Sequence, residues 1–222
     1  MTAVHDMAPR LYHTEHGVEI WHGDARAWIV GRNPRDFAAL VTDPPYGISY
    51  SSGMANARPG IVGDEDLSLR DDLLAWWGEG PALVFGSRRK PLPEGTRMVL
   101  TWDKGDAVGM GDLSIPWKPC TEEIYVLGRG FVGRRESCVL SFRPPPANQI
   151  SARRRQHAHE KPVPLMTHLL ARCPAGTILD PCAGSGSTLV AARELGRAAV
   201  GVEIEERYCE IIADRLRQGM LL

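Results

Sequence analysis

The sequence has few cysteines, and no two of them stand at the spacing of a known cysteine motif. The five cysteines are an odd number, and no two form a Cys-x-x-Cys pair. This argues against a disulfide framework and against a zinc site, because both need cysteines at set spacings. We therefore expect no bound metal, and reduced, mostly buried thiols at Cys120, Cys138, Cys173, Cys182 and Cys209.

Long hydrophobic runs are also missing. No window approaches the ~18 uninterrupted apolar residues of a membrane-spanning helix. The N-terminal stretch MTAVHDMAPRLYHTEHG lacks the basic-then-apolar layout of a signal peptide. With 43% hydrophobic and 24% charged residues, the composition is that of a soluble globular protein. We expect a cytoplasmic protein with no membrane partner.

The 222 residues can bury one sizeable core, so we expect a single domain spanning residues 1–222. Apolar runs bounded by turn residues predict strands at 18–22, 38–42, 82–85, 98–102, 123–127, 177–179 and 198–202. Helical periodicity predicts helices at 67–77, 162–171, 188–195 and 205–216. Strands that alternate with helices indicate an α/β fold with a mostly parallel sheet covered on both faces.

The sequence has almost no excess of acidic or basic residues, since the net charge is -1. The acidic and basic residues are unevenly distributed along the chain. Residues 129–161 contain eight basic and two acidic residues, which gives this segment +6 and leaves -7 for the rest. Such a segment is either an electrostatic footprint for a polyanion or a solvated basic loop.

A glycine-rich turn follows the predicted strand at 177–179. In LDPCAGSGSTL, Gly184 and Gly186 allow a sharp turn and a close backbone approach, and the N–H groups of the next helix favour an anion. A dinucleotide fingerprint would need glycine at Leu189, and a P-loop would need lysine at Ser187. Either the turn holds a nucleoside-type cofactor with a smaller anionic group, or it is only a tight turn. Glu203 ends the next strand, where a ribose-binding acid is usual in such folds.

A second motif, DPPY, follows the predicted strand at 38–42. In an open α/β sheet, ligands gather at the carboxyl ends of the strands, so Asp43 and Gly184 should face one crevice. Pro44 and Pro45 fix the backbone and have no N–H, so this rim offers the Asp43 carboxylate and the Pro44 carbonyl as acceptors. Two fixed acceptors match the exocyclic amino group of a nucleobase, and Tyr46 offers a ring for stacking. In isolation, a Pro-Pro turn with a surface tyrosine is the alternative.

Together these motifs resemble the S-adenosylmethionine-dependent amino-methyltransferases of DNA, which modify N6 of adenine or N4 of cytosine. DPPYG is similar to their catalytic tetrapeptide, LDPCAGSGST to their methionine-binding turn and HEKP to the element preceding it. WHGDA, TWDKGD and EIEERYCEIIADRL are supporting matches, and the motif order resembles the permuted beta class. The resemblance implies a doubly wound, mostly parallel seven-stranded sheet of the Rossmann-like methyltransferase type.

The resemblance also implies roles for individual residues. Asp43 and Pro44, with Pro45, would hold the target amino group, and Tyr46 would stack on a flipped base. Lys161 would help to hold the carboxylate of the cofactor. The expected cofactor-binding set is Asp24, Ala25, Asp43, Lys161, Asp180, Pro181, Cys182, Ala183, Gly184, Ser185, Gly186, Ser187, Glu203 and Ile204. Cys182 and Ser187 stand where the family usually has Phe and Thr, which alters packing but removes no backbone contact.

The expected reaction is a direct displacement on the methyl group of S-adenosylmethionine, with double-stranded DNA as partner. The Asp form of the tetrapeptide resembles the adenine enzymes more than the cytosine ones. RNA or protein-amide methylation and a catalytically silent DNA-binding relative remain alternatives. Arg153, Arg154 and Arg155 are the expected phosphate contacts. The sequence leaves open the DNA site, a homodimer and a restriction partner.

Overall fold

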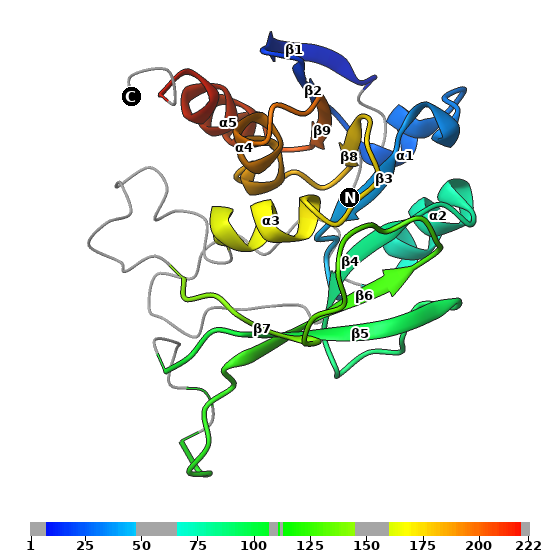
Figure 1. Cartoon of the computed structure of the whole chain (residues 1–222). Helices are drawn as coiled ribbons and strands as arrows, with labels where there is room; N and C mark the ends of the chain where they lie inside the picture. Colours follow the sequence, from blue (N-terminus) through cyan, green and yellow to red (C-terminus); the bar gives the residue numbers. More distant parts are fainter. Residues whose placement is uncertain (1–7, 48–65, 107–110, 112, 145–159, 219–222) are drawn as a thin grey trace.

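The computed structural model describes residues 8–47, 66–106, 111, 113–144 and 160–218. Within these residues nine strands form one sheet, in the order β1-β2-β9-β8-β3-β4-β6-β5-β7 (Figure 1). The strands are β1 Arg10–Glu15, β2 Val18–His22, β3 Ala39–Thr42, β4 Ala82–Gly86, β5 Thr96–Asp103, β6 Thr121–Leu127, β7 Val139–Ser141, β8 Ile178–Asp180 and β9 Ala199–Glu203. The helices are α1 Ala25–Ile29, α2 Ser68–Trp77, α3 Val163–Leu170, α4 Ser187–Glu194 and α5 Glu206–Gln218, with a short 3-10 turn at Pro34–Asp36.

The α/β class is confirmed, but the mostly parallel seven-stranded sheet is wrong. The sheet is mixed: β2, β9, β8, β3 and β4 run parallel, whereas β6 lies antiparallel between β4 and β5, and β1 antiparallel to β2. All seven predicted strands are present within a few residues, and the additional ones are β1 and β7. An apolar run predicts a strand but not its direction, so the antiparallel course of β6 could not be read from it.

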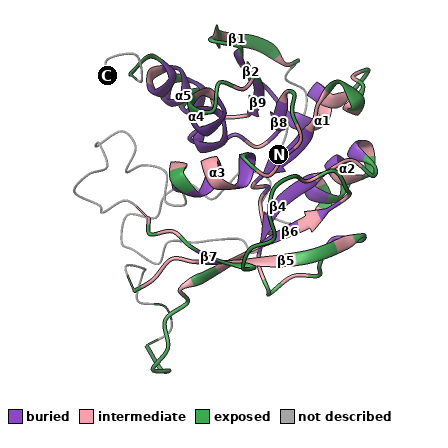
Figure 2. Cartoon of the chain, viewed as in Figure 1, coloured by how far each residue is buried: buried purple, intermediate pink, exposed green. Residues whose placement is uncertain are grey.

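Two layers of core cover the two faces of the sheet. Successive side chains of a strand alternate between the faces, so Ala39 and Val41 enter one core and Leu40 enters the other. The first core is closed by α3, α4 and α5, and the second contains Trp28 of α1 and Trp77 of α2. The strands of the sheet interior are buried over most of their length (Figure 2). The helices therefore hold a rigid central sheet, whose strand ends can position a site.

The cysteines are less uniformly buried than expected. Cys173 and Cys209 are buried, Cys120 and Cys182 are partly exposed, and Cys138 is exposed. Burial raises the pKa of Cys173 to about 12, so this thiol stays protonated. No helix among the described residues is both apolar and long enough to cross a membrane.

Candidate active site

The candidate site lies where the order of the strands reverses. From β3 the chain passes through α2 to β4 on one side, and from the neighbouring β8 it passes through α4 to β9 on the other. Such a switch point opens a crevice at the carboxyl ends of the two strands. Asp43 directly follows β3, Asp180 ends β8, and Glu203 ends the next strand, β9. The fold thus brings together three acids that are far apart in the sequence.

The carboxylate of Asp43 is held by two side-chain donors. Lys161 Nζ donates to Asp43 Oδ2 at 2.5 Å, and the Tyr46 hydroxyl donates to Oδ1 at 2.6 Å. Burial, followed by the charge of Asp43, raises the pKa of Tyr46 well above its usual value, so the phenol remains a donor. Pro44 is buried and Pro45 partly exposed. The two prolines have no N–H, so their backbone offers only carbonyl acceptors. The two donors to Asp43 are Lys161 and Tyr46, for which the sequence predicts other roles: holding the cofactor carboxylate and stacking on the base.

Lys161 is the buried member of a partly buried array of alternating charges. Its Nζ lies 3.2 Å from Glu122 Oε2, and the other oxygen of this carboxylate, Oε1, accepts from Lys104 Nζ. Burial opposes charge on Lys161, but the carboxylates of Asp43 and Glu122 outweigh it and raise the pKa of the ammonium group. Burial likewise opposes charge on Glu122, yet Lys161 and Lys104 lower its pKa to about 2. Lys161 and Glu122 are therefore both ionised at neutral pH.

The segment from Asp180 to Ser187, here called the glycine turn, joins β8 to α4. Gly184 and Gly186 have φ of +52° and +81°, in the left-handed region that favours glycine. A Cβ on Gly186 would lie 2.7 Å from Ile212 Cγ1, so a side chain does not fit there either. The Gly184 N–H donates to Glu203 Oε2 at 2.8 Å, which fixes the turn against the end of β9.

Glu203 is a buried acid that accepts from the backbone. Besides Gly184, the N–H of Glu205 donates to its Oε1 at 2.8 Å. Burial raises the pKa of Glu203 to about 7, although the two backbone N–H groups act in the other direction. Asp24 stands beside this strand end, because the N–H of its neighbour Gly23 donates to the Glu203 carbonyl at 2.9 Å. The Asp24 carboxylate caps α1 by accepting from Ala27 N at 3.0 Å.

Asp180 and Cys182 connect the glycine turn to the tetrapeptide. Asp180 accepts from the Cys182 N–H at 3.1 Å. Burial raises the pKa of Asp180 to about 6, and the charge of Asp43 contributes in the same direction. Asp43 likewise acts on Cys182, whose pKa burial raises well above its usual value. These interactions place residue 43 beside the start of the glycine turn, at the carboxyl ends of the neighbouring strands β3 and β8.

A buried ion pair, Arg215–Glu160, contacts the backbone of the glycine turn. Arg215 of α5 donates from Nη1 to the Ser185 carbonyl at 2.6 Å and lies 3.2 Å from a carboxylate oxygen of Glu160. The side chains of Arg215 and Glu160 are 7% and 6% exposed. Because Glu160 precedes Lys161, this pair ties the glycine turn to the residue that holds Asp43.

The remaining predicted residues divide by location. Ala25 starts α1 and is buried, Ser187 starts α4, and the Ile204 carbonyl lies 3.2 Å from His22 Nε2. The buried residues of the turn include Pro181, Ala183, Ser185, Gly186 and Ser187. Arg153, Arg154 and Arg155, and the loop after Gly47, lie outside the described residues. Sequence reasoning missed Lys104, Glu122, Glu160 and Arg215. The motifs TWDKGD, HEKP and EIEERYCEIIADRL contain Lys104, Glu160 and Arg215, but no motif contains Glu122.

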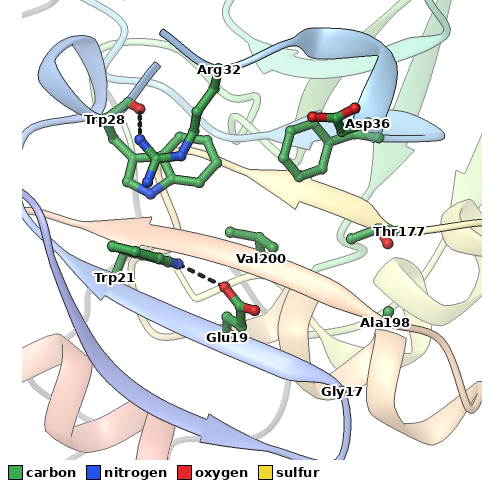
Figure 3. Close-up of a pocket in the computed structure, with 10 residues that line it drawn as sticks. Gly17, Glu19, Trp21, Trp28, Arg32, Asp36, Thr177, Ala198 and Val200 are labelled. Atoms are coloured by element: carbon green, nitrogen blue, oxygen red, sulfur yellow. Dashed lines mark hydrogen bonds between the residues drawn. The ribbon is translucent and has the colours of Figure 1, made fainter. Parts of the chain in front are cut away.

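A separate pocket of about 330 Å³ lies toward the opposite ends of the parallel strands (Figure 3). Its lining includes Ala198 and Thr177, which precede β9 and β8, and the rings of Trp21 and Trp28. Arg32 lies over both rings, 4.9 Å and 4.2 Å from their centroids. None of the predicted site residues lines this pocket, so its position does not support a role in the predicted chemistry.

Comparisons with known proteins agree with the motifs. Residues 111–214 match the N6_N4_Mtase family model, described as DNA methylase. Over 192 residues the chain is 28% identical to the putative methylase YubD of Escherichia coli (strain K12). The aligned part covers 79% of this chain and 79% of YubD. Over 72 residues it is 39% identical to the type II methyltransferase M.ScaI of Streptomyces caespitosus, which covers 32% of this chain and only 24% of that protein.

A solved structure shows the same fold. The M1.HpyAVI–SAM complex superposes with a TM-score of 0.65 at 20% identity, over 90% of this chain and 98% of that one. The Rossmann-like arrangement is thereby confirmed. The family match and the relatives also confirm the resemblance of this chain to the amino-methyltransferases of DNA.

Proposed function

We propose that this chain, a relative of the N6/N4 amino-methyltransferases of DNA, transfers a methyl group from S-adenosylmethionine to the exocyclic amino nitrogen of a base in double-stranded DNA. The proposed target is N6 of adenine, because the tetrapeptide begins with Asp43. Residues 1–222 act as one methyltransferase domain in this proposal. The observation that carries it is the Asp43 carboxylate, held in place by Lys161 and Tyr46 at the switch point of the sheet.

The residues around the glycine turn fit the proposed cofactor. The carboxylate of Glu203 is buried with a raised pKa, and the groups nearest to it are backbone N–H groups and other acids. A ribose offers two hydroxyl donors, which would stabilise the ionised carboxylate at this position. The left-handed Gly184 and Gly186 let the backbone come close to a ligand. Asp24 lies at the adjoining strand end, where it would contact the adenine.

When bound, S-adenosylmethionine supplies an electrophilic methyl group on a sulfonium. The chain's own residues act on the nucleophile. Each oxygen of Asp43 has two lone pairs and uses one for Lys161 or Tyr46, so it can accept a hydrogen from the target amino group. The Pro44 carbonyl would accept the second hydrogen. In the proposed transfer the amino nitrogen would bond to the methyl carbon while the carbon–sulfur bond breaks and the neutral thioether leaves. The two acceptors would stabilise the positive charge that the nitrogen gains, and the proton that it then loses would pass to solvent.

The target nitrogen is inaccessible inside a stacked duplex, so we propose that the base is flipped into the crevice. Unstacking costs a few kcal/mol, which stacking on Tyr46 offsets in part. Tyr46 has its hydroxyl fixed on Asp43 at 2.6 Å, and a ring anchored at one end is a suitable stacking surface. The basic segment 129–161 would contact the phosphates.

Methyl transfer from radiolabelled S-adenosylmethionine tests the proposal. The protein is incubated with duplex DNA, RNA or protein, and modified nucleosides from the DNA are identified by mass analysis. We expect N6-methyladenine from duplex DNA and a loss of about a hundredfold or more in Asp43→Ala, with no loss in the matched control Asp36→Ala. N4-methylcytosine alone would replace the adenine assignment, label only in RNA or protein would redirect the substrate, and absence of transfer to all three would reject the proposal.

DNA binding has its own test. Replacing Arg153, Arg154 and Arg155 with alanine removes three positive charges, so the slope of log affinity against log salt should become shallower by about 2 to 3. The slope is measured by fluorescence anisotropy on a duplex at several salt concentrations. An unchanged slope would show that these arginines do not contact phosphates.

A further inference from the structure

Glu122 is a buried carboxylate that none of the predicted roles explains. It lies on β6, its side chain is 15% exposed, and it contacts the ammonium groups of Lys104 and Lys161. Lys161 in turn lies 3.2 Å from Glu122 and 2.5 Å from Asp43. These four side chains, from Lys104 to Asp43, form a row of alternating charge that ends on the proposed substrate-binding carboxylate. We call this row the charge array.

We propose that Glu122 is a positioning residue: it shares Lys161 with Asp43 and thereby sets how much of the Asp43 carboxylate is left to hold the target amino group. The inference rests on the proposed function and goes beyond it, because it assigns Lys161 to the catalytic acid and not to the cofactor. It gives a role to a strand, β6, that carries none of the residues predicted from the motifs.

The charges of the array explain why a second carboxylate is needed. With Glu122 present, two ammonium groups and two carboxylates balance one another, with side-chain exposures from 7% at Lys161 to 27% at Asp43. Without Glu122, the array would contain two ammonium groups and one carboxylate, and Lys161 would pair with Asp43 alone. A carboxylate in a tight ion pair has its charge compensated and accepts more weakly from a neutral N–H. The amino group would then be held less well at the moment of attack.

The neighbourhood of Lys161 supports a fixed position for its ammonium group. Around it are Asp43 after β3, Glu122 on β6 and Lys104 after β5. The rings of Phe85 and Tyr46 lie 4.9 Å and 5.9 Å from Nζ. The charge of Asp43 contributes to the raised pKa of Asp180 at the end of β8, and Glu160 pairs with Arg215. Burial lowers the pKa of Lys161, and only its two carboxylates reverse the shift, so loss of one should bring the pKa down.

The test compares Glu122→Gln with Glu122→Asp, which keeps the charge, and with Lys104→Met, which changes the far end of the array. The Lys161 ammonium signal is followed against pH by ¹⁵N NMR and assigned by its absence in Lys161→Arg. In the wild type we expect no titration up to about pH 11, and in Glu122→Gln a midpoint lower by about one to three units. Glu122→Asp should recover part of the shift, and Lys104→Met should show no downward shift.

Steady-state kinetics give the second readout. In Glu122→Gln, kcat should fall about tenfold to a hundredfold while KM for S-adenosylmethionine stays within about twofold. A rise in KM for S-adenosylmethionine without a fall in kcat would show that Lys161 serves the cofactor, and would overturn the inference. An unmoved Lys161 titration in Glu122→Gln, or an equal downward shift in Lys104→Met, would also overturn it.

The two proposals can fail separately. If the wild type transfers no methyl group, the proposed function fails, whereas the NMR titration still decides whether Glu122 controls Lys161. If the wild type is active and Glu122→Gln keeps its kcat, the inference fails and the function stands. If Glu122→Gln does not fold, Glu122→Asp decides. Its side chain is one methylene shorter, so its carboxylate lies farther from Lys161, and both kcat and the pH midpoint of the Lys161 titration must be lower than in the wild type.

Discussion

Gly186→Ala should destabilise the protein by two separable effects at the glycine turn. Gly186 has a φ of +81°, where an alanine costs about 1–2 kcal/mol. Its Cβ would also stand 2.7 Å from Ile212 Cγ1 and 2.9 Å from Cγ2, so α5 must shift. Overpacking of this kind costs about 1–3 kcal/mol. The free energy of unfolding should therefore fall by about 2–5 kcal/mol, a large part of the 5–15 kcal/mol typical of a domain.

Two other glycines separate the effects. Gly196 has a φ of +65° and no atom within 4 Å of an added Cβ, so Gly196→Ala should lose only the backbone cost of about 1–2 kcal/mol. Gly201 has no left-handed φ, but its Cβ would lie 2.5 Å from Leu189 Cδ1. Gly201→Ala should therefore show only the packing cost, about 1–3 kcal/mol.

Urea unfolding followed by circular dichroism measures all three variants, and calorimetric titration with S-adenosylmethionine measures cofactor binding. Gly186→Ala should weaken binding because the turn moves, whereas Gly196→Ala should not. Ile212→Ala removes the atoms that clash, so it should cost less in the Gly186→Ala background than in the wild type, by about 1–3 kcal/mol. Equal stability losses in Gly186→Ala and Gly196→Ala would refute the contact with Ile212 and the reasoning built on it.

Three further predictions concern the buried charges. Burial raises the pKa of Glu203 from 4.5 to about 7, so between these pH values the folded state binds more protons than the unfolded state. The free energy of unfolding should therefore fall as pH rises through this range, by at most about 3 kcal/mol. Urea titrations at pH 5 and pH 7 should show this fall, and Glu203→Gln should make the free energy of unfolding less dependent on pH. If ribose hydroxyls bind the ionised carboxylate, binding of S-adenosylmethionine near pH 6.5 should release protons, seen by calorimetry as a heat that depends on the buffer's ionisation enthalpy and is lost in Glu203→Gln. Arg215→Met leaves Glu160 buried beside an apolar chain and should cost about 3–5 kcal/mol in urea unfolding, part of which Glu160→Gln should restore in the double variant.

The sequence predicts the elements that carry strong local signals. Alternating or continuous apolar runs locate the seven expected strands, and the carboxyl-end rule places Asp43 beside the glycine turn. β1 reads RLYHTE, an edge strand with little apolar pattern, and β7 has three residues, so neither gives a periodic signal. α1 has only five residues, too few to show helical spacing.

The charge array could not be predicted for a different reason. An ion pair between Lys161 and Asp43 joins residues 118 positions apart, and Glu122 enters from an antiparallel strand whose direction no apolar run encodes. Local patterns specify what a residue can do, but not which distant charge it will meet. Residues such as Glu122 become visible only when the strand order is known.

The segment Glu160–Lys161 gives the HEKP motif a physical meaning that spacing alone does not. Two adjacent side chains turn to different partners: Glu160 reaches Arg215, which holds the Ser185 carbonyl, and Lys161 reaches Asp43. Because Glu160, Arg215 and Lys161 are buried, each of these three charges would be strongly destabilising without its partner. Folding therefore requires the glycine turn, the tetrapeptide and this segment to reach their positions together. In the proposed reaction the methyl donor and the target amino group must be placed to within a fraction of an ångström, and a backbone tied by charge to the glycine turn and to Asp43 is suited to keep that placement constant.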